Sequence, residues 1–380
     1  MKFSCWITTV LTLACAAGSP ATRPADFAAF RDGGGLSGQA AQLSAPPMKL
    51  RWTYQSGEDT QQTSIESAAV ISGKTVYVAD DRGVLHAIDL ATGKAKWKYS
   101  TDNGFEATPL VMDGRVYLGD LAGLLHCVSA ANGQKIWTFD TESGIHSSAN
   151  AVLTDAGPRI LFGNDAGQIL CMDTQGKKVW AAEAGDRINA CPAMATKSGQ
   201  PIALFSGCDA HLRAIRVSDG KEIFNTDLGA LAGGSPALHD GHIFVGTDRG
   251  HVLCFSMDGK PVWDFDKIVE EAMVYASPAV SDGIVTVGAR DRKIYGLDEK
   301  TGHQIWTVAT HGEIDSSALI SGGRVYLGSK DKTLYVLDLK TGKQIWNFTA
   351  GRAITASPCI ANGALVIGDT HGAVYCLESK

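Results

Sequence analysis

The sequence lacks the features of several large classes of protein. Its net charge is −6, from 34 Lys and Arg against 40 Asp and Glu, and no basic stripe is present. Since nucleic-acid binders carry a basic surplus, we exclude nucleic acid as a partner. The longest apolar run, Trp6 to Ala14, has nine residues, less than half of the roughly 20 that span a bilayer. No Gly-x-Ser-x-Gly elbow, phosphate-binding loop or haem-attaching Cys-x-x-Cys-His occurs.

Glycine, in contrast, is abundant and evenly spread. The chain of 380 residues holds 43 glycines, with 44% hydrophobic and 19% charged residues. This balance is that of a globular protein, and so many dispersed glycines indicate many tight turns.

The N-terminus resembles an export signal. Lys2 supplies a positive charge, the apolar run follows, and Ala14 to Ala17 offers small residues for cleavage. We therefore predict a signal peptide over residues 1–17 and a flexible tether over residues 18–47. Thr12-Leu-Ala-Cys15 also resembles a bacterial lipobox, so two alternatives stay open: simple cleavage, or lipidation of Cys15. Either one predicts an exported protein, in the periplasm or on the outer membrane of a bacterium.

One segment recurs along the rest of the chain. Ala87-Ile-Asp-Leu-Ala-Thr-Gly-Lys-Ala-Lys-Trp97 returns at residues 127–137, 296–306 and 336–346, and in shorter form elsewhere. Each copy closes on an aromatic residue, and these lie between 39 and 45 residues apart: Trp52, Trp97, Trp137, Trp180, Phe224, Trp263, Trp306 and Trp346. That period is typical of a propeller blade.

Each unit reads as four short strands rich in Val, Ile, Tyr and Trp, separated by Gly-containing turns. The last unit stops without its Trp strand, whereas an orphan strand, residues 49–54, precedes the first full unit. Pairing these two closes the ring and removes exposed edges. The sequence therefore predicts an all-β fold over residues 48–380: an eight-bladed β-propeller of four-stranded antiparallel blades, closed by the N-terminal strand.

The Ala-x-Asp-x-x-Thr-Gly-Lys-x-x-Trp segment resembles the tryptophan-docking repeat of pyrroloquinoline-quinone-type (PQQ-like) propellers. The resemblance covers residues 48–380 and implies that each closing aromatic stacks between neighbouring blades. One branch of these proteins comprises quinoprotein dehydrogenases, which bind the quinone with calcium. The other is non-enzymatic and similar to BamB, the lipoprotein of the outer-membrane assembly machinery. The dehydrogenases carry an adjacent Cys-Cys pair and long insertions, and this sequence has neither, which favours the second branch.

Equivalent positions on the inner strands form a ring around the channel of such a propeller. Aligning the units places at this position Ile65, Gly233 and six polar residues: Glu106, His146, Asn189, Tyr275, Asp315 and Thr355. Three interpretations remain open, namely a polar lining of a water-filled channel, a small-ligand or ion site, and a catalytic site. Imidazole and carboxylates are common metal ligands, but Asp315 belongs to a blade far from those of Glu106 and His146. We therefore assign no metal.

Two of the cysteines are candidates for a disulfide. Cys191 and Cys208 flank a predicted hairpin at similar distances from its turn, and opposed residues of antiparallel strands approach within bonding reach. The alternatives are this bond, favoured by an oxidising compartment, or two reduced thiols.

The favoured reading is a non-catalytic, monomeric scaffold at the bacterial envelope, without a cofactor. It binds envelope proteins that the sequence does not identify, and contacts the membrane only through a lipid on Cys15. Two alternatives remain: a small quinoprotein dehydrogenase that uses pyrroloquinoline quinone and calcium, and a propeller that binds carbohydrate or another small ligand.

Overall fold

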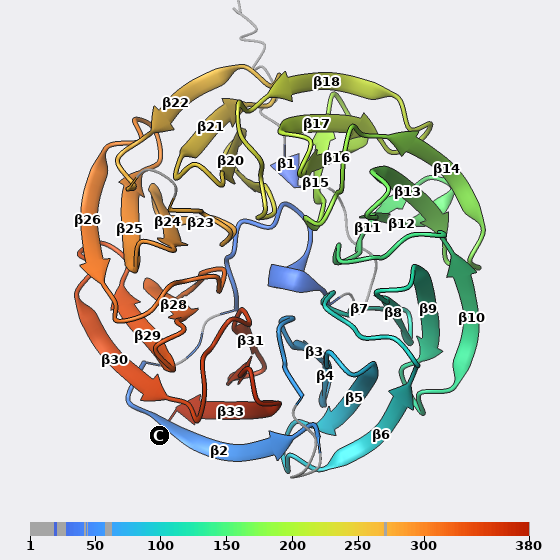
Figure 1. Cartoon of the computed structure of the whole chain (residues 1–380), viewed down its shortest axis with the longest axis horizontal. Coiled ribbons are helices and arrows are strands. Elements are labelled where there is room, and N and C mark those ends of the chain that lie inside the picture. Colours follow the sequence, from blue (N-terminus) through green and yellow to red (C-terminus); the bar gives the residue numbers. More distant parts are fainter. Residues whose placement is uncertain are drawn as a thin grey trace, which may run out of the picture.

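The computed structural model shows eight β-sheets arranged as blades around one axis (Figure 1). It describes residues 19–20, 28–41, 43, 45–57, 63–269 and 272–379. The predicted signal peptide and Cys15 lie outside these residues. The described part of the chain contains no helix with the length and apolarity that a membrane crossing requires. The all-β, eight-bladed fold predicted from the repeat is confirmed.

The strands of the first four blades, from the inner to the outer edge, are β3 (Val70–Ser72), β4 (Thr75–Ala79), β5 (Val84–Asp89) and β6 (Ala95–Ser100); β7 (Leu110–Met112), β8 (Arg115–Gly119), β9 (Leu124–Ser129) and β10 (Lys135–Asp140); β11 (Asn150–Thr154), β12 (Gly157–Gly163), β13 (Gln168–Asp173) and β14 (Lys178–Glu183); and β15 (Ala193–Lys197), β16 (Gln200–Ser206), β17 (His211–Arg216) and β18 (Glu222–Asp227). A short strand, β1 (Ser19–Pro20), pairs with β15.

The other four blades comprise β19 (Ala237–His239), β20 (His242–Gly246), β21 (Val252–Ser256) and β22 (Pro261–Phe265); β23 (Ala279–Ser281), β24 (Ile284–Ala289), β25 (Lys293–Asp298) and β26 (Gln304–Ala309); β27 (Leu319–Ser321), β28 (Arg324–Gly328), β29 (Thr333–Asp338) and β30 (Gln344–Thr349); and β31 (Cys359–Ala361), β32 (Ala364–Gly368), β33 (Ala373–Ser379) and β2 (Met48–Gln55). One 3₁₀ turn, η1 (Phe30–Asp32), lies near the axis.

The ring closes in the last blade, where β2 from the N-terminal part pairs antiparallel with β33 from the C-terminal end (Figure 1). Leu50 lies opposite Leu377, and Lys49 pairs with the Glu378 carboxylate at 3.1 Å. This is the closure predicted from the orphan strand. With β2 in place, every blade has its fourth, outer strand. The ring therefore has no incomplete blade whose exposed edge could pair with another chain.

Each closing aromatic joins its blade to the next one. The indole N–H of Trp52 donates to the Leu90 carbonyl at 2.9 Å, in the turn between the third and fourth strands of the following blade. The same bond recurs for five more indoles: Trp97, Trp137, Trp180, Trp263 and Trp306. The indole of Trp52 also lies flat on Gly93, where a Cβ atom would come within 2.6 Å of the ring. Glycine is therefore required there, and its φ of 70° suits it as well.

Two closing aromatics depart from this pattern. Trp346 faces the last blade, whose outer strand comes from the N-terminus, so no such turn follows it. Phe224 has no N–H group to donate. In its blade the Lys197 ammonium donates to the Met257 carbonyl at 3.0 Å and lies 5.9 Å from the centre of the Phe224 ring. Lysine thus supplies the donor that phenylalanine lacks.

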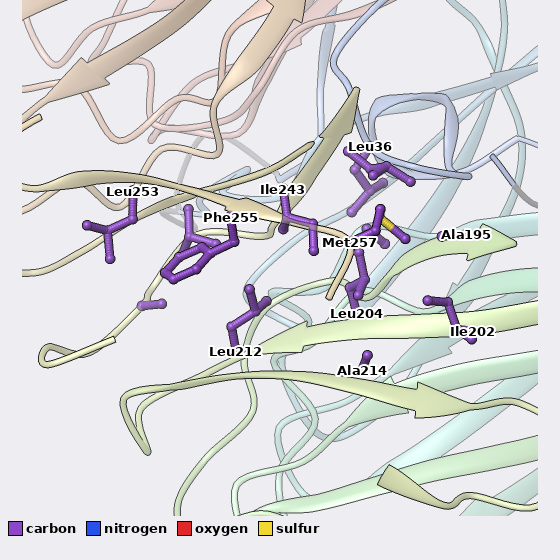
Figure 2. Packing of buried hydrophobic residues seen from close by; sticks show 14 of the residues in the cluster. Leu36, Ala195, Ile202, Leu204, Leu212, Ala214, Ile243, Leu253, Phe255 and Met257 are labelled. Carbon is purple, nitrogen blue, oxygen red and sulfur yellow. The ribbon is translucent and has the colours of Figure 1, made fainter. Parts of the chain in front are cut away.

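The hydrophobic core consists of clusters between neighbouring blades. In Figure 2, Leu204 and Leu212 of the fourth blade face Ile243 and Phe255 of the fifth. Because both faces of each sheet are covered, the second strands of the blades are buried without alternation, as in the fully buried β4. Leu36, from the N-terminal region, completes the cluster at its inner end.

Leu36 belongs to residues 28–41, which we call the axial segment. The sequence predicts a flexible tether over residues 18–47, and for the axial segment this prediction is wrong. The segment runs across the channel (Figure 1) and hydrogen-bonds to inner strands of the second, fourth, fifth, sixth and seventh blades. The physical reason is that the inner strands are sheet edges with unpaired backbone groups. The small residues read as a tether let this backbone approach them closely.

Ring closure and axial packing predict different effects for three truncations. Removing residues 1–27 deletes only β1 from the described structure, so we expect Tm to stay within about 2 °C of the full chain. Removing residues 1–41 also exposes the inner-strand edges and should lower Tm further. Removing residues 1–54 takes away β2 and should lower Tm by about 10 °C or more. Thermal unfolding followed by circular dichroism measures this order; equal melting of the first and third variants would contradict the closure.

The lysine in the fourth blade provides a second prediction. Lys197→Met should lower the free energy of unfolding by about 1 kcal/mol, because the Met257 carbonyl loses its donor. In a Phe224→Trp background the indole N–H replaces that donor, so the same substitution should cost less than half as much. Denaturant unfolding of the double-mutant cycle measures this coupling. Asp258→Ala, which removes only the exposed ion pair of Lys197, is the control, and an equal cost in both backgrounds would disprove the compensation.

Candidate functional site at the mouth of the channel

A cavity of about 170 Å³ lies on the propeller axis, where the inner segments of the blades begin. Five of the six predicted ring residues line it: Glu106, Asn189, Tyr275, Asp315 and Thr355. The sixth, His146, lies beside Glu106, with 3.5 Å between its Nε2 and the carboxylate. Phe30 of the axial segment lines the cavity as well.

The sequence alignment misplaces the ring member of the first blade by one residue. Glu66 lines the cavity, whereas Ile65 is fully buried. Ile65 packs on Gly368 of the preceding blade, just as Ile145 packs on Gly119 and Ile314 on Gly288. Repeated Ile-x-Ser motifs were the signal that aligns Ile65 with these isoleucines. The first blade therefore contributes a third carboxylate to the ring.

The first three blades make one side of the mouth acidic. The His146 imidazole lies between Glu106 and Asp165, with 3.0 Å between Nδ1 and the Asp165 carboxylate. Burial raises the pKa of Glu106, and repulsion from Glu66, Asp165 and Asp81 adds to this effect, while His146 opposes it. Several carboxylates thus share a small volume with one imidazole between them.

The sixth and seventh blades contribute a network of paired charges to the other side of the mouth. The Arg290 guanidinium donates two hydrogen bonds to the Asp315 carboxylate, at 2.7 and 3.0 Å, and lies 4.2 Å from the centre of the Tyr275 ring. Lys330 pairs with the same carboxylate at 2.9 Å. Burial works to raise the pKa of Asp315, but the bonds from Arg290 and Lys330 outweigh it, so this pKa is lowered. Lys330 also pairs with the Glu313 carboxylate at 2.7 Å, so the two cations and two carboxylates of this side neutralise one another.

Half of these charges come from a second ring that sequence reasoning missed. Asp81, Asp165, Arg290 and Lys330 lie in the turns between second and third strands. Each donates its backbone N–H to the connector that leads to an inner strand, as from Asp165 to the Gly144 carbonyl at 2.9 Å. The position can be read from the sequence, because it directly follows the residue that opens each turn, as Asp81 follows Asp80 and Asp165 follows Asn164.

The column of small residues below the ring has a structural role. Backbone N–H groups of one blade donate to the Ser or Thr hydroxyl of the next at 2.8–3.2 Å, and six such links are present: Ala68 to Thr108, Thr108 to Ser148, Cys191 to Ser235, Ser235 to Ser277, Ser277 to Ser317 and Ser317 to Ser357. This chain of links is interrupted at two blade interfaces, because Ala68 and Cys191 have no hydroxyl group that could accept a hydrogen bond. These residues therefore hold neighbouring blades together.

Two polar atoms of the ring remain without partners. The side-chain oxygens of Asn189 and Thr355 are buried and make no hydrogen bond among the described residues. Unsatisfied buried polar atoms are rare and indicate water or a ligand. Both oxygens are closed to solvent, however, so they do not indicate a ligand in the cavity itself.

The structure does not gather the three candidate metal ligands. Glu106 and His146 are neighbours, but Asp315 is held by Arg290 and Lys330 in another blade. Among the described residues, one group has metal-ligand geometry: His239, Asp240 and Glu299. The His239 Nδ1 lies 2.7 Å from the Glu299 carboxylate. This bond raises the pKa of His239, and its effect is larger than the opposing effect of burial. The pair joins the end of β19 to the turn after β25 of the next blade.

The disulfide predicted between Cys191 and Cys208 is absent, since both are free thiols. The reason is register. Ala193 pairs with Leu204 and Met194 with Ala203, so Cys191 is level with Ser206, and Cys208 lies two residues further on. Burial raises the pKa of both thiols, which makes them poor nucleophiles.

A buried Asp–His–Tyr chain escaped sequence analysis because its members come from two blades. The His86 ring lies 2.8 Å from the Asp80 carboxylate and 2.9 Å from the Tyr54 hydroxyl. The next blade repeats it with Asp120, His126 and Tyr99. Such a repeat at the blade interface is structural, and burial raises the pKa of Tyr54 to about 12.

The fold and the repeated docking of aromatics define this molecule as an eight-bladed propeller built from PQQ-like repeats. A family model described as outer membrane protein assembly factor BamB matches residues 37–203 and 208–380. The chain therefore belongs to this family.

Individual relatives agree at low identity. A BamB of Nitrosomonas eutropha is 30% identical over 99 residues, 26% of this chain and 24% of the relative. The matched segments thus span only about a quarter to a third of the curated relatives' length. The crystal structure of BamB from Moraxella catarrhalis superimposes with a TM-score of 0.72 at 17% identity, over 88% of this chain and 98% of that one. Quinohemoprotein alcohol dehydrogenase from Comamonas testosteroni gives 0.73 at 14%, over 88% and 77%. These structures show the shared fold.

The channel does not fit the quinone that the enzymatic relatives of this fold imply. Its volume of about 170 Å³ is below the roughly 300–1,000 Å³ of pockets that hold drug-sized ligands. Phe30 and the column of Ser and Thr residues line it and set this volume. The sequence also has no adjacent cysteine pair. We derive no reaction at this position.

The acidic side of the mouth predicts a pH-dependent gain in stability. Because the folded-state pKa of Glu106 is raised, its ionised form disfavours folding above that pKa and has no effect well below 4.5. Glu106→Gln should therefore raise the free energy of unfolding at pH 7, by less than about 1 kcal/mol since the side chain is partly exposed, and leave it unchanged near pH 3.5. Glu183→Gln, on the exposed outer strand β14, is the control. A loss of stability at pH 7 would contradict the assignment.

Proposed function

We propose that this protein is a non-catalytic propeller that binds protein partners during outer-membrane protein assembly at the bacterial envelope. Membership of the BamB family over nearly the whole propeller carries this proposal. The matched relatives are named as outer membrane protein assembly factors. The export signal expected over residues 1–17 supports a location in the periplasm, or at the outer membrane if Cys15 carries a lipid.

The mouth face offers a surface suited to a protein partner. Leu231 and Val269, 42% and 59% exposed, flank the turn at Asp248–Gly250 of the fifth blade. The Leu231 N–H donates to the Asp248 carboxylate, and the Val269 carbonyl lies against Gly250. Exposed apolar residues rimmed by polar groups are typical of protein-binding sites. The charged ring of the cavity lies on the same face and supplies electrostatic complementarity.

The competing function is that of a small quinoprotein dehydrogenase. We consider it because a quinohemoprotein alcohol dehydrogenase has the same fold. The size of the channel opposes it. The discriminating experiment adds pyrroloquinoline quinone with calcium and follows dye reduction across alcohols and sugars. Reproducible turnover would reject the scaffold proposal.

The partner surface predicts a localised loss of binding. Leu231→Asp and Val269→Asp should each weaken capture of outer-membrane assembly proteins from solubilised envelopes of the source bacterium at least about tenfold, because they place a charge in an apolar contact. Ile305→Asp, at an equally exposed position (47%) on the outer strand β26, should leave capture unchanged. Circular dichroism checks that all three variants fold. If Ile305→Asp weakened capture as much as Leu231→Asp and Val269→Asp, the mouth would be rejected as the binding face.

A further inference from the structure

The interface between the fifth and sixth blades departs from the repeat at the turn that receives the docking indole. Five of the six residues whose carbonyl accepts an indole N–H are uncharged: Leu90, Ala130, Thr174, Val217 and Leu339. The sixth, which accepts from Trp263, is Glu299. Its side chain is only 8% exposed. A buried carboxylate thus stands where the other copies carry an uncharged side chain.

A histidine departs from the repeat at the same interface. Six of the inner strands have three residues, and their last residues are Ser72, Met112, His239, Ser281, Ser321 and Ala361. His239 is the titratable side chain of this set, and its Nδ1 lies 2.7 Å from the Glu299 carboxylate of the next blade. The two departures therefore meet in one contact. Because the other copies build the same fold without them, they indicate a function beyond folding.

Asp240 completes a group with the geometry of metal ligands. It follows His239 in the turn to β20, and its carboxylate lies 4.0 Å from the His239 Nδ1. The ligand atoms of these two residues and Glu299 all lie within 4.8 Å of one another. Ligand atoms around a tetrahedral zinc ion are separated by about 3.3–3.6 Å, since each lies about 2.0–2.2 Å from the metal. The separations of 2.7 and 4.0 Å bracket this distance, so small rotations of the side chains suffice.

The charge and the exposure of the group suit a cation that enters from solvent. Three carboxylates act on His239, those of Glu299, Asp240 and Asp282. Asp282 belongs to the turn whose Gly283 carbonyl accepts the Glu299 N–H at 2.9 Å. The Asp240 side chain is 83% exposed, which leaves one side of the group open. Two carboxylate ligands and a neutral imidazole balance the charge of a divalent ion.

We propose that His239, Asp240 and Glu299 bind a divalent transition-metal ion, zinc(II). An imidazole nitrogen with carboxylate oxygens is a zinc donor set, whereas calcium and magnesium prefer oxygen ligands alone. Zinc takes the place of the proton between Nδ1 and the Glu299 carboxylate, and this proton passes to solvent. Three protein ligands leave one position for water.

The ion bridges two blades, because His239 and Asp240 belong to the fifth blade and Glu299 to the sixth. It lies beside the docking contact of Trp263, whose indole donates to the Glu299 carbonyl at 2.9 Å. Zinc therefore reinforces this blade interface. The site lies in turns at the end of the blades opposite the mouth, so the proposal does not depend on the proposed partner.

The test uses the full chain, purified without a histidine tag and stripped of metal with EDTA. Calorimetric titration with zinc chloride should show one site per chain, and about 100 µM zinc should raise Tm by at least about 2 °C. Glu299→Leu gives this turn the side chain that Leu90 and Leu339 have in theirs, so the variant should fold. It should weaken zinc binding at least about tenfold. His239→Gln keeps a donor for Glu299 but loses the nitrogen ligand, and should weaken binding to the same extent.

His251→Gln is the matched control, because His251 pairs with a single carboxylate, that of Asp264 at 2.8 Å. This variant should retain the zinc site. The absence of zinc binding to the unmodified chain, undiminished binding in His239→Gln and Glu299→Leu, or an equal rise in Tm with calcium would each overturn the proposal. Crystals soaked in zinc should show an anomalous peak between His239 and Glu299. If neither variant folds, this peak decides.

Discussion

The architecture depends on one contact, in which an aromatic ring lies on a glycine of the following blade. The ring covers the glycine face, and its indole N–H satisfies a turn carbonyl, so each blade aligns the next. A propeller has no element that holds all blades at once apart from its closure and its axis. Repeated pairwise docking therefore sets the angle between blades, and the circle closes when β2 reaches β33. Where the indole is missing, at Phe224, the Lys197 ammonium takes over the bond.

Docking at the rim determines what happens at the axis. Eight inner strands converge there as unpaired edges, with backbone groups that must find partners. The Ser and Thr belt links blades above, and the axial segment supplies carbonyls below. The described axial segment hydrogen-bonds to the inner strands of five of the eight blades.

The mouth shows the reverse situation, because its charged groups belong to turns and connectors that packing does not constrain. Carboxylates from the first three blades lie across the channel from the ion-paired side chains of the sixth and seventh. Such an arrangement costs stability, as the raised pKa of Glu106 indicates. The regular fold does not require an unequal distribution of charge around the mouth. Such a distribution is suited to a face that binds a partner.

The sequence alone determined the number of blades, the four-stranded unit and the closure. These features follow from a local repeat, and every copy of it carries the same strand and turn propensities. It also placed most of the ring at the mouth. It misplaced Glu66 by one residue, since a side chain on a strand changes its surroundings with a single step in register. An error in register of the same kind made the predicted disulfide between Cys191 and Cys208 wrong. Only the tertiary structure decided the fate of the axial segment, whose Ala, Gly and Ser residues carry no periodic signal. Their packing depends on backbone edges that exist only after the eight blades have formed a ring.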